Sequence, residues 1–133
     1  MIFADSSFWI ALKNESDPDH ESAVRVMREI KSNRYGRLCT SDYVLDEVAT
    51  FISQRLKRHD VAFETLQSIL ASREVNLLKV DLAVFRTVVE IFRDYNFLSF
   101  TDATTCVLMR LHKINNIATF DEDFARLGFN VIK

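Results

Sequence analysis

Four acidic residues at the ends of apolar segments could together form one metal-binding site. They are Asp5, Glu47, Asp102 and Asp121. Each stands where a hydrophobic run stops or a helix is predicted to start, and no adjacent Lys or Arg neutralises it. Carboxylates that a fold brings together repel one another unless positive charge lies between them. Hard divalent cations such as Mg²⁺ and Mn²⁺ bind such oxygens, so the pattern predicts metal-assisted phosphodiester chemistry.

Glu47 carries the clearest signal of the four, because its helical neighbours are apolar. On a helix, the residues three before and four after it are Val44 and Phe51. The adjacent Asp46 has mainly polar or small neighbours instead. A carboxylate on an apolar stripe is costly without a partner. We therefore expect Glu47 to face the site, or to lie at the edge of the stripe, and Asp46 to face solvent.

The other three acids also have structural explanations when each is taken alone. Asp5 could cap a helix after the apolar run that precedes it. Asp102 follows Thr101, which is predicted to cap a helix, and a negative charge there is stabilised by the helix dipole. Asp121 and Asp123 lie in a segment that could also cap a helix. Their joint spacing therefore carries the functional prediction.

Apolar patterning predicts five strands that alternate with helices. The strands are expected over residues 1–4, 37–40, 75–80, 116–119 and 130–132, and the helices over 8–13, 19–31, 42–58, 61–72, 82–92, 101–113 and 121–127. This alternation predicts an α/β fold with a parallel sheet covered on both faces. Sites in such sheets form at the carboxyl ends of the strands, where Asp5 and Asp121 are expected.

Composition predicts one globular domain over residues 1–133. Apolar residues make up 48% and charged residues 27% of the chain. The net charge of −2 does not suit a general nucleic-acid coat, although it is compatible with a nucleic-acid enzyme. No apolar run reaches the ~18 residues that span a bilayer. The start of the chain has no basic segment before its apolar part, so we expect a cytoplasmic protein without a signal peptide. Cys39 and Cys106 are expected to be buried, reduced thiols.

The ordered set of acidic motifs resembles the PIN domain family. The matching segments are Ile2-Phe3-Ala4-Asp5-Ser6-Ser7, Ser41 through Glu47, Phe100-Thr101-Asp102-Ala103, and Ala118-Thr119-Phe120-Asp121-Glu122-Asp123-Phe124. The resemblance covers nearly the whole chain. Chain length and the order of the acids look most like the VapC-type toxins of toxin–antitoxin pairs.

The resemblance implies a PIN-like three-layer α/β/α fold with a parallel sheet of order 3-2-1-4-5. It also implies a metal-dependent endoribonuclease that uses Mg²⁺ or Mn²⁺ and is controlled by an antitoxin protein. The implied metal-binding and catalytic residues are Asp5, Glu47, Asp102 and Asp121, with Asp123 as an alternative or addition to Asp121. Supporting hydroxyl groups are implied at Ser6, Thr101 and Thr119. An antitoxin segment would place a basic side chain in the acidic cleft.

Substrate-binding residues are less evident from the sequence. Arg55, Lys57 and Arg58 could bind phosphates, or could simply be favourable cations at a helix end. Phe8, Trp9 and Phe97 could stack on bases or belong to the core. Eleven Phe and one Trp in this chain also predict a homodimer through helices in the 42–72 and 82–95 regions.

Other classes of protein explain the pattern less well. A phosphatase of the haloacid dehalogenase kind needs a second Asp where Ser7 stands. A receiver-type signalling domain needs paired acids on its first strand, and Ala4 precedes Asp5 here. A DNA-directed or structure-specific PIN nuclease, and a catalytically idle PIN-like binding module, remain alternatives. A pure binding module would have no reason to keep four mutually repelling charges.

Overall fold

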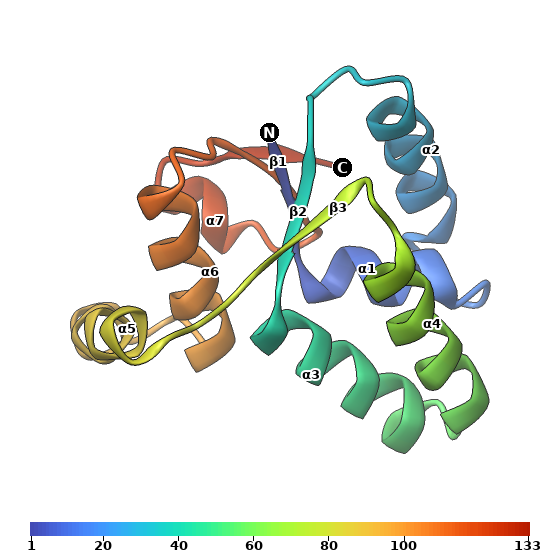
Figure 1. Cartoon of the computed structure of the whole chain (residues 1–133), viewed down its shortest axis with the longest axis horizontal. Helices are drawn as coiled ribbons and strands as arrows, with labels where there is room; N and C mark the ends of the chain where they lie inside the picture. The colour runs from blue at the N-terminus through green and yellow to red at the C-terminus, as the bar shows by residue number, and fades with distance from the viewer.

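A computed structural model describes residues 1–133, and its centre is a five-stranded parallel sheet (Figure 1). The strands are β1 (Ile2–Ala4), β2 (Leu38–Ser41), β3 (Val75–Leu78), β4 (Asn116–Ala118) and β5 (Asn130–Ile132). They pair side by side in the order β3-β2-β1-β4-β5, and every pair is parallel. The predicted fold class and strand order are therefore confirmed.

Helices cover both faces of this sheet. They are α1 (Ser6–Lys13), α2 (His20–Lys31), α3 (Asp42–Thr50), the π-helix η1 (Phe51–Arg55), α4 (His59–Ala71), α5 (Leu82–Asp94), α6 (Phe100–Leu111) and α7 (Asp123–Arg126). Figure 1 shows α1, α2 and α4 on one side of the strands, with α5, α6 and α7 on the other. The helix α3 continues from the carboxyl end of β2 at the bottom of that view.

The central strands are short, apolar and buried on both faces. Ile2, Phe3 and Ala4 of β1 are fully inaccessible to solvent, as expected for a central strand of a covered parallel sheet. Phe8 and Trp9 belong to the same core, and the Trp9 indole Nε1 donates a hydrogen bond to Thr40 Oγ1 at 3.2 Å. These two aromatic residues are thus core residues rather than exposed stacking platforms. Both cysteines are buried and free, as predicted.

The prediction of one continuous α-helix over residues 42–58 is wrong in its second half. The segment 42–58 begins as α3, but from Phe51 its turns widen into the π-helix η1. The Leu56 amide donates to the Phe51 carbonyl five residues earlier, at 3.2 Å. Lys57 then adopts a left-handed backbone with φ of 56°, which ends the helix before Arg58.

The predicted cap of α6 is also wrong. Ser99 rather than Thr101 caps this helix, because Ser99 and Asp102 form a reciprocal capping box. The Ser99 hydroxyl accepts a hydrogen bond from the Asp102 amide at 3.0 Å, and Asp102 Oδ2 accepts one from the Ser99 amide at 3.1 Å. Asp102 is therefore held at the first turn of α6.

Two smaller elements have bounds that differ from the predicted ones, because acidic side chains bind backbone amides beside them. The strand β3 ends at Leu78 instead of residue 80, and the Val80 amide donates to the Asp42 carboxylate at 3.2 Å. The last helix begins at Asp123 instead of Asp121, because Asp121 Oδ1 accepts from the Asp123 amide at 2.9 Å and forms a turn before the helix.

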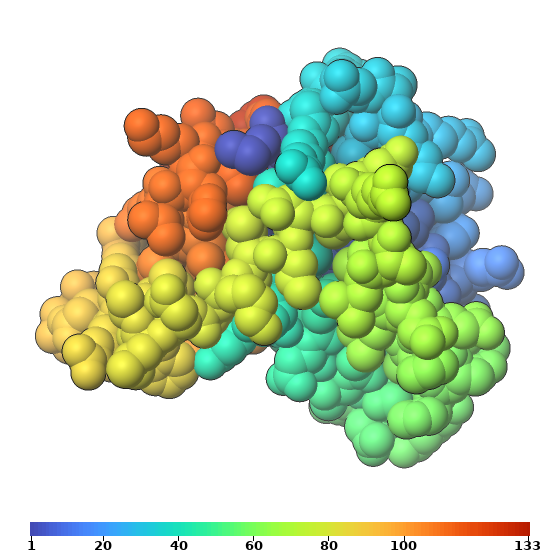
Figure 2. Space-filling view, in the orientation of Figure 1, coloured from blue at the N-terminus to red at the C-terminus, as the bar shows by residue number.

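The helix α5 leaves an apolar face uncovered at the edge of the molecule. In Figure 2 it is the yellow body that stands out from the left side. Four large apolar side chains at helical spacing are exposed on it: Leu82, Phe85, Val89 and Phe92. None of the helices has the length and apolar character needed to cross a membrane.

Candidate active site at the carboxyl edge of the sheet

The sheet brings residues from distant parts of the chain to one edge. Asp5 directly follows β1, Ser41 ends β2 and begins the helix of Glu47, and Thr119 directly follows β4. Because β1 lies between β2 and β4, these segments meet around Asp5. This edge is at the bottom of Figure 1, where β2 runs into α3.

Asp5 is the buried centre of the group. Its carboxylate is 2% exposed, and its Oδ2 accepts hydrogen bonds from Thr119 Oγ1 at 3.0 Å and Ser7 Oγ at 3.2 Å. Burial, and then the negative charge of Asp102, raise the pKa of Asp5 to about 7. A smaller effect in the same direction comes from Glu47.

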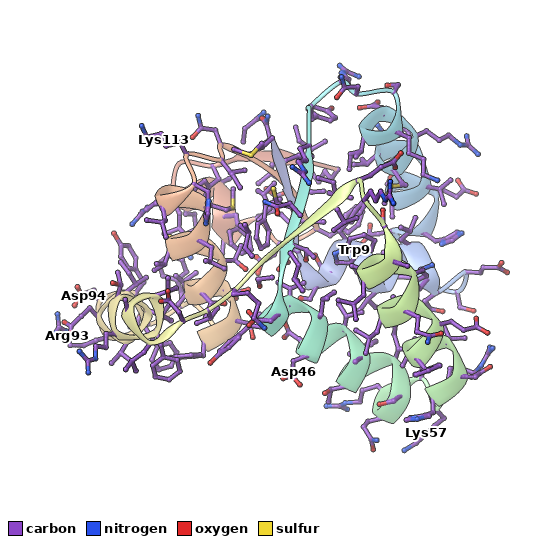
Figure 3. All side chains as sticks on the ribbon, in the orientation of Figure 1. Trp9, Asp46, Lys57, Arg93, Asp94 and Lys113 are labelled. Carbon is purple, nitrogen blue, oxygen red and sulfur yellow. The ribbon has the colours of Figure 1, made fainter.

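Glu47 and Asp46 face different environments, as the helical spacing predicted. Asp46 is exposed, whereas Glu47 is half-buried and has one oxygen, Oε2, out of contact with solvent. Figure 3 shows Asp46 on α3, with its side chain directed away from the sheet. Burial raises the pKa of Glu47, and the negative charges of Asp102 and Asp46 add to this effect. The nearby Ser6 hydroxyl acts in the opposite direction.

Asp102 lies close enough to the other acids for their charges to act on it. Burial raises the pKa of its carboxyl group, and the charges of Asp121 and Asp123 add to the effect. Its hydrogen bonds with Ser99 oppose this rise. The structure thus links Asp5, Glu47, Asp102 and Asp121 electrostatically, without a salt bridge from Lys or Arg to any of them.

Asp123 differs from these four because it has a cationic partner. Arg126 Nη1 is 2.8 Å from Asp123 Oδ1, and the same guanidinium lies 3.8 Å from the centre of the Phe97 ring. Asp121 has no such ion pair. Geometry therefore favours Asp121 over Asp123 as the fourth acid of the group.

The supporting hydroxyl groups extend beyond those that the sequence indicated. Thr119 binds Asp5 directly, Ser6 lies beside Glu47, and Thr101 lines a cavity that Glu47 also lines. Ser7 was missed: it contacts Asp5 Oδ2 and Thr119 Oγ1, and it accepts a hydrogen bond from the Phe120 amide at 3.0 Å. Its position two residues after Asp5 was the available signal, since a hydroxyl there can turn back to the carboxylate.

Two buried carboxylate oxygens are available as ligands for a divalent cation. Asp5 Oδ1 and Glu47 Oε2 have no hydrogen-bond partner. Burying such atoms unpaired is costly, and an all-oxygen donor set is what Mg²⁺ and Mn²⁺ bind. No group of three acidic, His or Cys side chains is placed so that it could hold a metal ion. Asp102 and Asp121 each use an oxygen on a backbone amide, and each keeps a second oxygen.

The sequence and fold are similar to those of known proteins. Residues 2–130 match the PIN domain family. The chain is 31% identical over 129 residues to the 23S rRNA-specific endonuclease VapC20 of Mycobacterium tuberculosis, in strains CDC 1551 / Oshkosh and ATCC 25618 / H37Rv, covering 97% of this chain and 95% of each relative.

Solved structures show the same fold. The crystal structure of M. tuberculosis VapC20, described as a Sarcin-Ricin loop cleaving toxin, has a TM-score of 0.85 and 32% identity, with 97% of this chain and 96% of that chain covered. VapBC2 from Rickettsia felis, bound to a DNA fragment from the promoter of the pair, has a TM-score of 0.72. The two sequences are 13% identical, and the match covers 98% of this chain and 97% of the R. felis chain. At this identity the similarity concerns the fold alone.

Proposed function

The chain belongs to the PIN domain family, and we propose that it is an endoribonuclease that hydrolyses RNA phosphodiester bonds as the toxin of a toxin–antitoxin pair. The observation that carries this proposal is the group of carboxylates at the carboxyl edge of the sheet. Buried, mutually repelling acids with unpaired oxygens are costly for stability, and phosphodiester hydrolysis gives them a use.

We propose Mg²⁺ or Mn²⁺ as the cofactor. Asp5, Glu47 and Asp102 would hold the cation, and Asp121 would complete the site directly or through water. When bound, the cation supplies stabilisation of the charge on the phosphate oxygens and lowers the pKa of nearby water. The two uncoordinated oxygens of Asp5 and Glu47 are the structural support for this assignment.

The residues of the chain prepare this site in two ways. Ser7 and Thr119 fix the rotamer of Asp5 through its Oδ2, so that its Oδ1 is directed elsewhere. The capping box fixes Asp102 at the start of α6. Attack by water in line with the leaving 3′-oxygen would break the P–O3′ bond, leaving a 5′-phosphate on one fragment and a 3′-hydroxyl on the other. No His is near these acids in the sequence, which favours activation of the water by the cation and a carboxylate over an imidazole base.

Ribosomal RNA is the substrate class that we propose first, because the relative that matches 97% of the chain is named as a 23S rRNA-specific endonuclease. An enzyme that cleaves this RNA would act in the cytoplasm, where ribosomes are. The enzymatic alternative is cleavage of DNA, and the same assay distinguishes the two.

We also propose a homodimer and an antitoxin partner. The exposed apolar face of α5 supports the dimer. A cavity of about 760 Å³ between α1, α2 and α4 supports the partner, because apolar residues such as Trp9 and Met27 line it together with four cations, Lys13, Lys31, Arg37 and Arg73, and one acid, Glu74. That combination suits an amphipathic antitoxin segment with acidic side chains at this cavity, in addition to a basic side chain of the same partner that would enter the acidic cleft. The cavity lies away from the acids, so it is not the catalytic site.

Purified protein should cleave ribosomal RNA when Mg²⁺ or Mn²⁺ is present, and should stop when EDTA is added. Asp5→Asn should keep the fold and lose the activity, because it removes charge rather than packing. Glu64→Gln is the control and should keep activity, since Glu64 is an exposed acid on α4 that lines neither of the two cavities of this structure. Cleavage of DNA instead of RNA would favour the alternative, and full activity in EDTA would refute the metal assignment.

A further inference from the structure

A second cavity adjoins the acidic group and is lined in part by residues that the proposed chemistry leaves unused. It has a volume of about 320 Å³ and lies along α3 and η1. Glu47 and Thr101 line its end nearest the acids. Asp46, Thr50, Phe51, Gln54 and Arg55 line the rest of it. The cavity therefore connects the carboxylates with one aromatic, one amide and one cationic side chain.

The π-helix explains why these side chains share one wall. Glu47, Phe51 and Arg55 follow one another in steps of four residues. In an α-helix each step of four advances by about 40° around the axis, so such a row winds away from one side. The wider turns of η1 counter that drift, and all three side chains reach the same cavity. A π segment of this kind is frequent at functional sites.

Three cationic residues, Arg55, Lys57 and Arg58, lie at or just after the end of η1, and only Arg55 lines the cavity. Arg58 is paired with Asp60 at 3.2 Å. Lys57 lies beyond the end of η1, where the backbone turns, and it does not line the cavity (Figure 3). Arg55 lines the cavity and has no salt-bridge partner. A polyanion approaching a group of carboxylates needs such a free cation beside it.

Phe51 is an exposed aromatic residue in the wall of this cavity. Its side chain is 37% exposed, although it stands between polar residues Thr50 and Gln54 of the same cavity. An exposed aromatic ring next to a cation is the combination on which single-stranded RNA bases stack while their phosphates are held. Gln54 adds an amide that can both donate and accept hydrogen bonds at a base edge.

We infer that this cavity is the subsite for the nucleotide next to the scissile phosphate, with the Phe51 ring stacked on its base and Arg55 bound to its phosphate. This inference rests on the proposed ribonuclease function. It adds substrate-positioning residues that lie outside the acidic group. Arg55 is eight residues beyond Glu47, or about 12 Å along a helix, so the subsite extends away from the point of cleavage.

The test measures binding of a fluorescein-labelled single-stranded RNA oligonucleotide by anisotropy, in an Asp5→Asn background that does not cleave it. Phe51→Leu should weaken binding roughly tenfold, and Phe51→Trp should retain it, because base stacking requires an aromatic ring. Phe63→Leu is the matched control: Phe63 is 56% exposed on α4 and lines neither cavity, so affinity should stay within about twofold.

Arg55→Gln should lower affinity to a similar extent for different RNA sequences and reduce the slope of log affinity against log salt by about one. Arg58→Gln is its control and should leave the slope unchanged. With the catalytic acids intact, both subsite variants should raise KM more than they lower kcat, as expected when they remove uniform substrate binding.

The outcomes distinguish failure of the subsite from failure of the proposed ribonuclease function. Equal binding by Phe51→Leu, Phe51→Trp and the unsubstituted protein would overturn the subsite. So would a change of oligomeric state in Phe51→Leu by light scattering without a change in RNA affinity, because Phe51 would then be a protein contact. If the unsubstituted protein neither binds nor cleaves any RNA, the ribonuclease function itself fails.

Discussion

Thr119 Oγ1 donates a hydrogen bond of 3.0 Å to Asp5 Oδ2, although the two residues are 114 positions apart in the sequence. This contact exists because β4 pairs directly with β1, so that the residues following the two strands become neighbours. Thr119 lowers the pKa of the Asp5 carboxyl group and partly offsets the effect of its burial.

Replacing this hydroxyl should change the pH dependence of cleavage. Thr119→Val keeps the shape of the side chain but removes a hydrogen bond to the carboxylate, so the pKa of Asp5 should rise further. The acidic limb of the pH–rate profile should then move to higher pH, and cleavage near pH 6 should fall about tenfold, as for the loss of one charge-assisted hydrogen bond of ~1.5 kcal/mol.

Thr105→Val provides the control for that experiment. Thr105 is also buried, but its hydroxyl has no hydrogen-bond partner. Removing an unsatisfied hydroxyl should leave the profile in place and preserve or slightly raise the melting temperature. Identical profiles for Thr119→Val and the unsubstituted protein would show that the contact does not tune Asp5.

Stability without metal should fall as the pH rises, because the pKa of Asp5 is raised by folding. In the unfolded chain this carboxyl titrates near 3.8, and in the folded protein near 7. Between these values the folded state binds the proton more tightly, so stability is greatest below pH 4 with respect to this group and is lost up to about pH 7. The total loss is on the order of 4 kcal/mol.

Glu47 and Asp102 have pKa values raised in the same direction and should add to this loss. In EDTA, Asp5→Asn should therefore melt at a higher temperature than the unsubstituted protein at pH 8, and the difference should shrink towards pH 4. Thermal unfolding followed by circular dichroism measures both. A difference that does not depend on pH would contradict the assigned ionisation of Asp5.

The adjacent acids of α3 should differ in metal binding. Glu47 has a buried oxygen without a partner, whereas Asp46 is exposed. Glu47→Gln should weaken Mn²⁺ binding at least tenfold, or about 1.4 kcal/mol, and Asp46→Asn should change it less than about twofold. Isothermal titration calorimetry provides the comparison, and equal losses in the two variants would refute the division of roles.

The central sheet was predictable from the sequence, because its strands are buried on both faces and appear as uninterrupted apolar runs such as Ile2–Ala4. The orientation of Glu47 was also predictable, since it depends only on helical spacing. The π turns of η1 were not, because no Pro or Gly marks them. The role of Ser7 depends on β4 lying beside β1, which local sequence cannot show.

The sequence alone could have shown that Asp123, unlike Asp121, has a cationic partner. Arg126 stands three residues after Asp123, a spacing at which opposite charges meet on a helix. The cap of α6 could also have been predicted, because Ser99 and Thr101 are both capping residue types near the start of the helix. The capping box decided it, since only Ser99 has an acid, Asp102, three residues later.

The outer face of α5 should mediate self-association. Val89 lies at the middle of this face and is 44% exposed, next to exposed Phe85 and Phe92. Val89→Glu should convert a dimer into a monomer because it places a charge in an apolar contact. Light scattering across micromolar concentrations measures the change. Leu111→Glu, at the exposed end of α6, should leave the mass unaltered. A monomer in the unsubstituted protein would refute the dimer.

The strand order also determines when the protein can become active during its synthesis. Asp5 is among the first residues to leave the ribosome, but Thr119 and Asp121 come near the end of the chain, and β4 must pair with β1 before they reach Asp5. A nascent chain therefore carries an incomplete site until β4 has emerged and paired with β1.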